Sequence, residues 1–316
     1  MTAKTIKLIE KKNLWFLISS IIIISGLVLM GMRGVKQEPV LNFGIDFTGG
    51  ASFILSFDTL NQAHRQSTVD PESINLNFIQ SLRTALKKMD LETSQLQITE
   101  DLEVLIKTPH LSNDKRKQVL DALEVVGGSL TVLEIDIIGP TIGEELRRQS
   151  IWIILVVSLG LLLYIWWRFE LIYGAAALLA VMHDALLLIS VAAFLAIEVN
   201  TAFVAAILTV LGYSINDTIV IFDRIRENSR NKDPEPIKVL LNRSISQMFT
   251  RSIHTSFTTV FVVLSLFIFG GTTIKSFALV LMIGILAGTY SSLFIASPFL
   301  YVFSKDEMTL SNGEPA

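Results

Sequence analysis

An acidic residue lies inside one of the most apolar parts of the sequence, where it could bind and release a proton. Asp217 stands in LGYSINDTIVIFDRIREN, residues 211–228, and on a helix it lies roughly 8 Å from Phe222 at ~1.5 Å per residue. Its polar neighbours on the same side of that helix are Tyr213, Ser214 and Asn216. An ionised carboxylate that faces lipid costs up to ~3 kcal/mol. We therefore expect this side of the helix to face a helix bundle or a water-filled cavity.

The next apolar segment could supply a basic partner for Asp217. Its polar residues recur along one helical face: they are Arg251, His254, Thr255, Thr258 and Thr259. Because the two segments are consecutive crossings of the membrane, we expect Arg251 to pair with Asp217. The expected helpers in this proton pathway are Asn216, Ser214 and Thr255. A carboxylate whose proton affinity changes with conformation is what a proton-coupled transporter requires. A structural ion pair that holds the two helices in register would leave the same pattern.

Two further groups of residues stand out inside apolar segments. His183 and Asp184 could form a secondary proton relay, because histidine titrates near neutral pH. The alternative is that they satisfy each other or nearby backbone groups and carry no protons. In the last apolar run, small residues recur at helical spacing: they are Gly284, Gly288, Ser291 and Ser292. That pattern is typical of close helix packing, and we assign no chemistry to it.

The sequence lacks the usual signatures of a metal site or of nucleotide hydrolysis. It contains no cysteine, and its 4 histidines have no metal-binding spacing. No GxxxxGK[ST] loop is present. We therefore expect a protein that is not an enzyme, with protons as the coupling ion, no cofactor or metal, and no binding of nucleic acid.

Apolar runs long enough to cross a membrane must position these polar residues. Of the 316 residues, 51% are hydrophobic and only 17% are charged, too apolar for an ordinary soluble domain. The runs are residues 14–32, 150–168, 171–196, 201–222, 252–271 and 276–303. Each is near the ~20 residues that a helix needs to span the hydrocarbon core. We predict six transmembrane helices, the first of them a retained span rather than a signal peptide, and the other five in a bundle of residues 149–303.

Lysine and arginine predict the orientation of these spans. Basic residues are concentrated in the tail 1–13 and in a loop expected at 223–250, whose second half suggests a helix on the membrane surface. The positive-inside rule places this loop and the tails 1–13 and 304–316 in the cytoplasm. Residues 33–148, which follow a single crossing, are then extracytoplasmic.

The extracytoplasmic segment has the pattern of a small α+β domain. The expected elements are a strand at 43–57 interrupted at Gly49 and Gly50, a helix at 72–89, strands at 96–100 and 102–108, a helix at 112–126, and a strand at 129–138. The order β-α-β-β-α-β is that of a ferredoxin-like unit. Residues 59–70 look like an insertion.

Three segments in order give the chain a resemblance to a known family. FGIDFTGG at 43–50, LGYSINDTIVIFDRIREN at 211–228 and IGILAGTYSSLFIASP at 283–298 resemble the signature segments of SecF, and the likeness extends over essentially the whole chain. This resemblance implies a member of the resistance-nodulation-division superfamily in the bacterial plasma (inner) membrane, which uses the proton-motive force to promote protein export. It also implies that Asp217 and Arg251 belong to the proton pathway.

The resemblance implies partners as well. They are SecD, which would supply a second carboxylate, and the Sec translocon channel of SecY, SecE and SecG. YajC-like and YidC-like proteins are further candidates. The chain would also contact the unfolded exported polypeptide and the lipid membrane. Two other functions stay open from the residues alone. One is an exporter of small molecules or lipids, and the other is a passive scaffold for the export channel.

Overall fold

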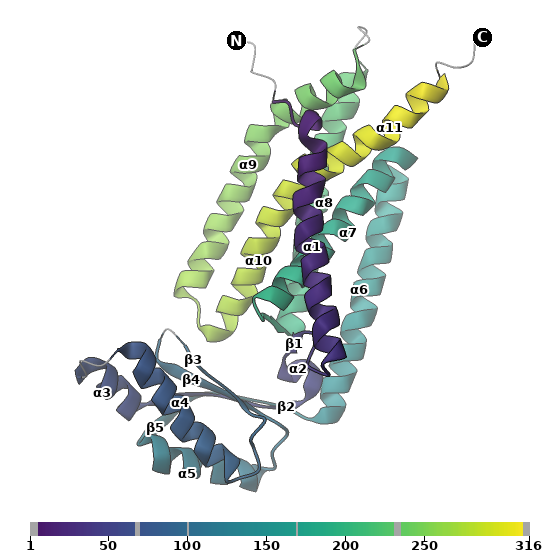
Figure 1. Cartoon of the computed structure of the whole chain (residues 1–316). Helices are drawn as coiled ribbons and strands as arrows, with labels where there is room; N and C mark the ends of the chain where they lie inside the picture. Colours follow the sequence, from purple (N-terminus) through teal and green to yellow (C-terminus); the bar gives the residue numbers. More distant parts are fainter. Residues whose placement is uncertain (1–5, 67–69, 100, 169, 231–234, 312–316) are drawn as a thin grey trace. The chain divides into compact units, whose positions relative to one another are not determined.

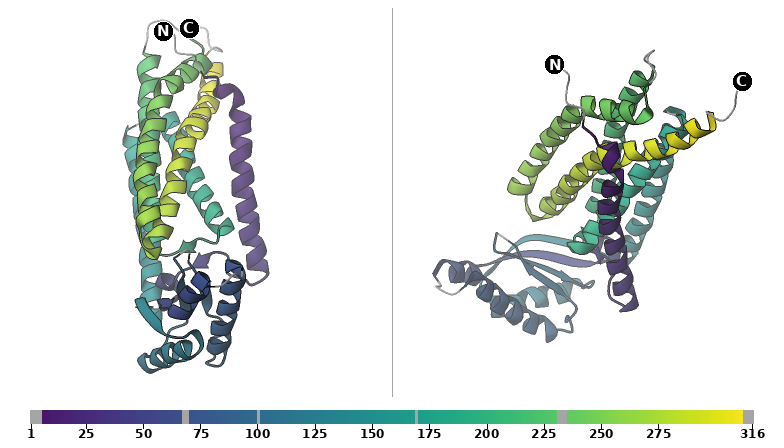
Figure 2. Two further views of the ribbon diagram at one scale, coloured as in Figure 1. Left: turned by 90° about the vertical axis from the view of Figure 1, so that its left-hand side faces the viewer. Right: turned by 45° about the horizontal axis from the view of Figure 1, so that its top comes forward.

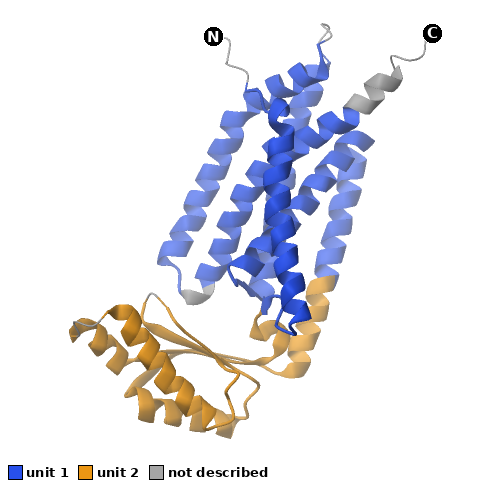
Figure 3. Cartoon of the chain, viewed as in Figure 1, with its two compact units in different colours: residues 1–42, 152–316 blue, residues 43–151 orange. Residues whose placement is uncertain are grey.

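The computed structural model describes residues 6–66, 70–99, 101–168, 170–230 and 235–311. They form two compact units (Figure 3). One unit consists of residues 1–42 and 152–316, and the other of residues 43–151. We describe each unit by itself.

Six helices in the described part of the chain are long and apolar enough to cross a membrane, as predicted. They are α1 (Lys12–Val35), preceded by the short helix η1 (Ile9–Lys11), then α6 (Pro140–Arg168), α7 (Leu171–Phe194), α8 (Thr201–Ser229) and α9 (Ile237–Phe269), and finally α10 (Thr272–Ser291), which continues through the π-helical turn η2 (Ser292–Ala296) into α11 (Ser297–Ser311). The central helices of this bundle are α7, α8 and α10, whereas α1, α6 and α9 are mostly exposed around them (Figure 1, Figure 2).

The helices exceed the apolar runs at several ends. At ~1.5 Å per residue the 29 residues of α8 and the 33 residues of α9 are longer than a hydrocarbon core of ~30 Å. The segment 223–250, expected as a loop with a separate surface helix, is therefore mostly the end of α8 and the start of α9. Charged residues do not by themselves end a helix, and α9 begins directly after Pro236.

The sixth span is not a single regular helix. Its middle is the π turn of η2, and Pro298 follows directly in α11. Proline has no N–H and its ring displaces the carbonyl four residues earlier, so a wider turn before it accommodates the lost hydrogen bond. The predicted close-packing face is confirmed. A Cβ atom at Gly284 would collide with the Val210 side chain, and one at Gly288 would lie 3.0 Å from the Cβ of Ser214.

The second unit has the predicted ferredoxin-like α+β order. Its elements are β2 (Gly50–Phe57), α3 (Asp58–Gln66), α4 (Pro71–Lys87), β3 (Gln95–Ile98), β4 (Glu103–Thr108), α5 (Asn113–Gly127) and β5 (Leu130–Ile138). The sheet order is β3-β4-β2-β5, with every neighbouring pair antiparallel. Phe53 and Leu55 of β2 form the core with Leu82 of α4 and Leu123 of α5, all fully buried.

Local signals in the sequence start and stop these helices. The side chain of Asp70 accepts a hydrogen bond from the backbone N–H of Ser73 and caps α4, and Ser112 caps α5 in the same way. Gly128, with φ +79°, ends α5. The supposed insertion at 59–70 contains α3, and its residues 67–69 lie outside the described part.

The strand expected at 43–57 starts later than predicted. It is divided into the two-residue strand β1 (Asn42–Phe43), the helical turn α2 (Ile45–Thr48) and β2; the two-residue strand β6 (Glu198–Val199) lies further along the chain. Gly49 and Gly50 have φ of +70° and +138°, values that side chains other than glycine rarely adopt. A Cβ at Gly50 would also collide with the carbonyl oxygen of Thr108. The close backbone approach expected at these glycines is therefore present.

Candidate proton-binding site

Asp217 lies inside the bundle rather than toward its surface. The residue is only 8% exposed. The hydroxyl of Ser252 on α9 donates a hydrogen bond of 2.8 Å to its Oδ1 atom. Its Oδ2 atom is buried and has no hydrogen-bond partner in the structure. A carboxylate charge with one unpartnered oxygen in such a place is costly, whereas a neutral carboxyl is not.

The side of α9 that faces Asp217 is lined by serines. Ser252, Ser256 and Val263 are the buried residues in this part of the helix, and they lie on one face. Tyr213 of α8 donates to the hydroxyl of Ser256 at 3.1 Å, and Ser256 shares a short hydrogen bond with Thr289 of α10. These hydroxyls hold α8, α9 and α10 together beside the carboxyl group.

Arg251 does not form the predicted ion pair with Asp217 in this conformation. It is exposed and lines an open groove of about 300 Å³ together with Val220, Asp223, Arg224, Glu227 and Met248. Successive residues of a helix are separated by ~100°, so α9 turns Arg251 away when it turns Ser252 toward α8. The guanidinium still interacts with Asp217 through its charge.

The other expected helpers of Asp217 are not gathered around it. Asn216 is exposed, and Thr255 is an exposed residue that bonds to the carbonyl oxygens of Arg251 and Ser252 in its own helix. Ser214 is fully buried but bonds to a different carboxyl group. The structure therefore brings Asp217 together with Ser252, a residue that the sequence pattern had not singled out.

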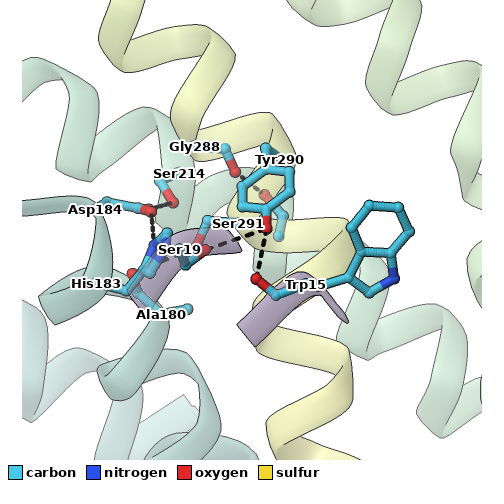
Figure 4. A network of polar contacts seen from close by, with 10 residues as sticks. Trp15, Ser19, Ala180, His183, Asp184, Ser214, Gly288, Tyr290 and Ser291 are labelled. Carbon is cyan, nitrogen blue, oxygen red and sulfur yellow. Dashed lines mark hydrogen bonds and ion pairs between the residues drawn. The ribbon is translucent and has the colours of Figure 1, made fainter. Parts of the chain in front are cut away.

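His183 and Asp184 form a second buried polar cluster (Figure 4). Nδ1 of His183 lies 2.9 Å from Oδ1 of Asp184, and Ser214 donates a short hydrogen bond to Oδ2. Asp184 is 0% exposed and His183 is 8% exposed. This geometry agrees with the alternative that the two side chains satisfy each other. One atom does not fit that account: Nε2 of His183 is buried and has no partner in the structure.

A polar segment at the end of α10 lies near both carboxyl groups, whereas the sequence pattern predicts only close packing there. The hydroxyl of Tyr290 donates to the carbonyl oxygen of Trp15 at 3.0 Å and lies 3.1 Å from the hydroxyl of Ser19 (Figure 4). Ser291 donates to the carbonyl oxygen of Ala180 at 3.4 Å. The signal that could have revealed this segment is its run of hydroxyl residues, TYSS at 289–292.

Charged residues accumulate at the end of α8 that carries Arg224. Nη2 of Arg168 donates to both carboxylate oxygens of Asp223, at 2.9 and 2.8 Å, and Arg224 lies 2.6 Å from Glu227. The first pair joins α6 to α8, whereas the second lies within α8, and Asp223, Arg224 and Glu227 line the groove that contains Arg251. The described residues include no group of three or more histidine, aspartate or glutamate residues that could hold a metal ion.

Comparison with known proteins identifies the family of this bundle. Residues 118–306 match the family described as protein export membrane protein SecD/SecF, C-terminal, and residues 39–59 match the SecD/SecF GG motif. The chain is 35% identical over 313 residues to the protein translocase subunit SecF of Sebaldella termitidis, which covers 98% of this chain and 96% of that one. It is 39% identical over 295 residues to SecF of Desulfurispirillum indicum, covering 90% and 87% of the two chains.

A solved structure shares the fold of the whole chain. The crystal structure of SecDF from Thermus thermophilus superimposes with a TM-score of 0.79 at 33% identity, covering 96% of this chain. This chain spans only 39% of the length of that SecDF chain. The six apolar helices, the α+β unit between the first two of them, and both family matches agree. The chain therefore belongs to the SecD/SecF family of protein export membrane proteins, as a SecF-type subunit.

Proposed function

We propose that this chain is the SecF-type half of an accessory complex that uses the proton-motive force to promote protein export across the bacterial plasma membrane. Members of its family are multi-pass transport proteins and not enzymes. The observation that carries the proposal is Asp217. This acidic residue is buried in the bundle with one hydrogen bond, and its Oδ2 atom has no partner. Intramembrane carboxyl groups in such surroundings are typical of proton pathways.

Proton binding by Asp217 can be coupled to motion through a change of partner. In the described conformation Asp217 accepts from Ser252, and a neutral carboxyl suits that site. Arg251 immediately precedes Ser252 on α9 and faces an open groove. A rotation of α9 that brings Arg251 to Asp217 would stabilise the ionised carboxylate instead. Proton release and helix rotation would then favour each other, which is the requirement for coupling.

The exposed polar stripe on α9 supports a SecD-type partner. Arg251, His254, Thr255 and Thr258 are exposed on a helix whose other exposed side chains include Phe257 and Phe261. Polar groups in lipid are costly, so protein or a wet cavity must cover this stripe. The SecDF relative contains the additional chain length that a partner would supply. Asn216 and Thr255 would assist Asp217 from the surface that this partner covers, and the partner would contribute the second carboxylate.

The orientation and further partners complete the proposal. Lysine and arginine favour cytoplasmic positions for both termini and for the connection between α8 and α9, and an extracytoplasmic position for the α+β unit. That unit would act on the unfolded polypeptide that emerges from the translocon of SecY, SecE and SecG.

Reconstitution tests this function directly. The chain and its SecD-type partner are placed in proteoliposomes with the translocon, and completion of translocation is measured with and without a proton gradient. We expect the gradient to stimulate completion in the wild-type complex, and Asp217→Asn to abolish that stimulation. Arg251→Met should reduce it strongly, and Ser265→Ala, which removes an exposed hydroxyl of α9, should leave it intact. Full gradient dependence in Asp217→Asn would instead indicate a passive scaffold.

A further inference from the structure

Four consecutive residues, the last three of α10 and the first of η2, lie against four different helices of the bundle. Consecutive residues are separated by ~100°, so Thr289 to Ser292 sample all sides of the helix. Thr289 bonds to Ser256 of α9, and Tyr290 bonds to Trp15 and Ser19 of α1. The remaining two lie near the carboxyl groups: Ser291 is close to Asp184 of α7, and Ser292, the first residue of η2, is close to Asp217 of α8. Two adjacent residues therefore lie beside the two buried carboxyl groups.

Neither carboxyl group is in direct contact with a lysine or arginine in the described residues. Asp184 is surrounded by His183 of its own helix, Ser214 of α8 and Ser291 of α10. The surroundings of Asp217 are Ser252, Ser292 and the more distant Arg251. No lysine or arginine in the described ranges makes an ion pair with either group. Burying two carboxylate charges in this way is costly, whereas neutral carboxyl groups need only their hydrogen bonds.

Each of the two serines has a choice of acceptor. A hydroxyl donates one hydrogen bond at a time. In the structure Ser291 donates to the carbonyl oxygen of Ala180 at 3.4 Å, and Ser292 donates to that of Gly288 at 2.5 Å. An ionised carboxylate beside either hydroxyl would be the stronger acceptor and would attract the donor away from the backbone. The hydroxyls thus respond to the charge of the groups that they face.

The backbone at this point can adapt to such an exchange. Ser292 is the first residue of the π turn η2, and Ser297 donates to its carbonyl oxygen at 3.4 Å. A π turn contains one extra residue, so its displacement along a helix rotates the side chains that it passes. A change at Ser292 would therefore also move Ser291.

We propose that Asp184 is a second proton-binding carboxyl group of this chain and that Ser291 and Ser292 couple its protonation to that of Asp217. The proposal deepens the proton pathway and rests on the proposed function for Asp217. A proton taken up by Asp184 lets Ser291 return to the backbone carbonyl, and a proton lost from Asp217 draws Ser292 to the carboxylate. Both changes act on one short segment of α10, so the two sites do not titrate independently.

Infrared pH-difference spectroscopy of the chain reconstituted with its SecD-type partner tests the proposal. The carbonyl stretch of protonated carboxyl groups is followed through a pH titration in the wild type and in single variants. We expect Asp184→Asn to remove one component of this band and Asp217→Asn to remove another. Ser291→Ala and Ser292→Ala should each move the midpoints of both components, by about one pH unit at the nearer group.

Matched variants keep the result interpretable. Ser214→Ala retains the Cβ atom that packs near Gly288, so it should fold normally and move the Asp184 component. Ser25→Ala removes a hydroxyl that bonds only within α1 and should move neither component.

The proposal is overturned if no component depends on Asp184 or Ser214, or if each serine affects only one carboxyl group. Loss of gradient dependence in Asp217→Asn without an Asp184 component would overturn this inference alone. An Asp184 component with a gradient-insensitive complex would overturn the proposed function alone.

Discussion

Asp184 and Asp217 are two buried carboxyl groups in the same bundle, but their hydrogen bonding differs. Both oxygens of Asp184 are used, by His183 and by Ser214. Only one oxygen of Asp217 is used, by Ser252, and the other has no partner in the structure. The first arrangement stabilises the bundle as it stands. The second leaves capacity for another partner, which is what a group that changes state during transport needs. The difference predicts a larger stability contribution from Asp184 and an easier change of partner at Asp217, although we propose that both groups bind protons.

The largest expected effect is on the free energy of unfolding, which should fall more in an Asp184 variant than in an Asp217 variant. Asp184→Ala leaves the hydroxyl of Ser214 and Nδ1 of His183 without their partner in a buried site, and should lower the free energy of unfolding by about 3 kcal/mol. Asp217→Ala loses one hydrogen bond and should cost about 1 kcal/mol. Denaturant unfolding of the purified variants in detergent measures both values. Equal losses would show that the two surroundings do not differ in energy.

A smaller effect is expected from the close contact between α10 and α8, the helix that carries Asp217. Gly284→Ala places a Cβ atom against Val210 and should destabilise the bundle by about 2 kcal/mol. The control is Gly212→Ala on α8, where no atom lies within 4 Å of the added Cβ. That change should be neutral or stabilising by up to about 1 kcal/mol, because alanine favours helix. Unfolding in the same detergent compares them, and a harmless Gly284→Ala would contradict close packing there.

The smallest effect concerns the single hydrogen bond of Asp217. Ser252→Ala removes that bond and should reduce gradient-stimulated translocation about fivefold, which corresponds to about 1 kcal/mol. The free energy of unfolding should also fall by about 1 kcal/mol, because Asp217→Ala loses the same hydrogen bond. The translocation assay in proteoliposomes measures the loss, with Ser265→Ala as the exposed serine control. An unaffected Ser252→Ala would show that this contact has no part in coupling.

Much of the fold follows from patterns in the sequence. Apolar runs predict the six spans, and the helices expected at 72–89 and 112–126 are present as α4 and α5. The ends of the spans are predicted less accurately, because hydropathy shows which residues can lie in lipid and does not show where a helix ends. For that reason α9 begins at Ile237, well before the apolar run at 252.

The contacts of the site could be predicted only in part. Asp217 stands out because a carboxylate in an apolar segment is expensive. The sequence pattern predicts Arg251 as the partner of Asp217 on α9, one residue away from the observed Ser252. An arginine stands out in an apolar segment, whereas a serine does not. The face that a helix buries depends on its neighbours, and serines that can bond to their own helix leave little pattern. For the same reason, the pattern around Ser291 and Ser292 predicts close packing and gives no sign of their hydrogen bonds.

Proton flux measured during translocation tests the central claim most directly. Proteoliposomes that contain this chain, its SecD-type partner and the translocon are loaded with a pH-sensitive dye, and a pH gradient is applied while a substrate crosses. The account predicts proton movement that accompanies translocation in the wild type and is lost in Asp217→Asn, while the variant complex still assembles. Equal proton movement in the wild type and in Asp217→Asn would contradict it.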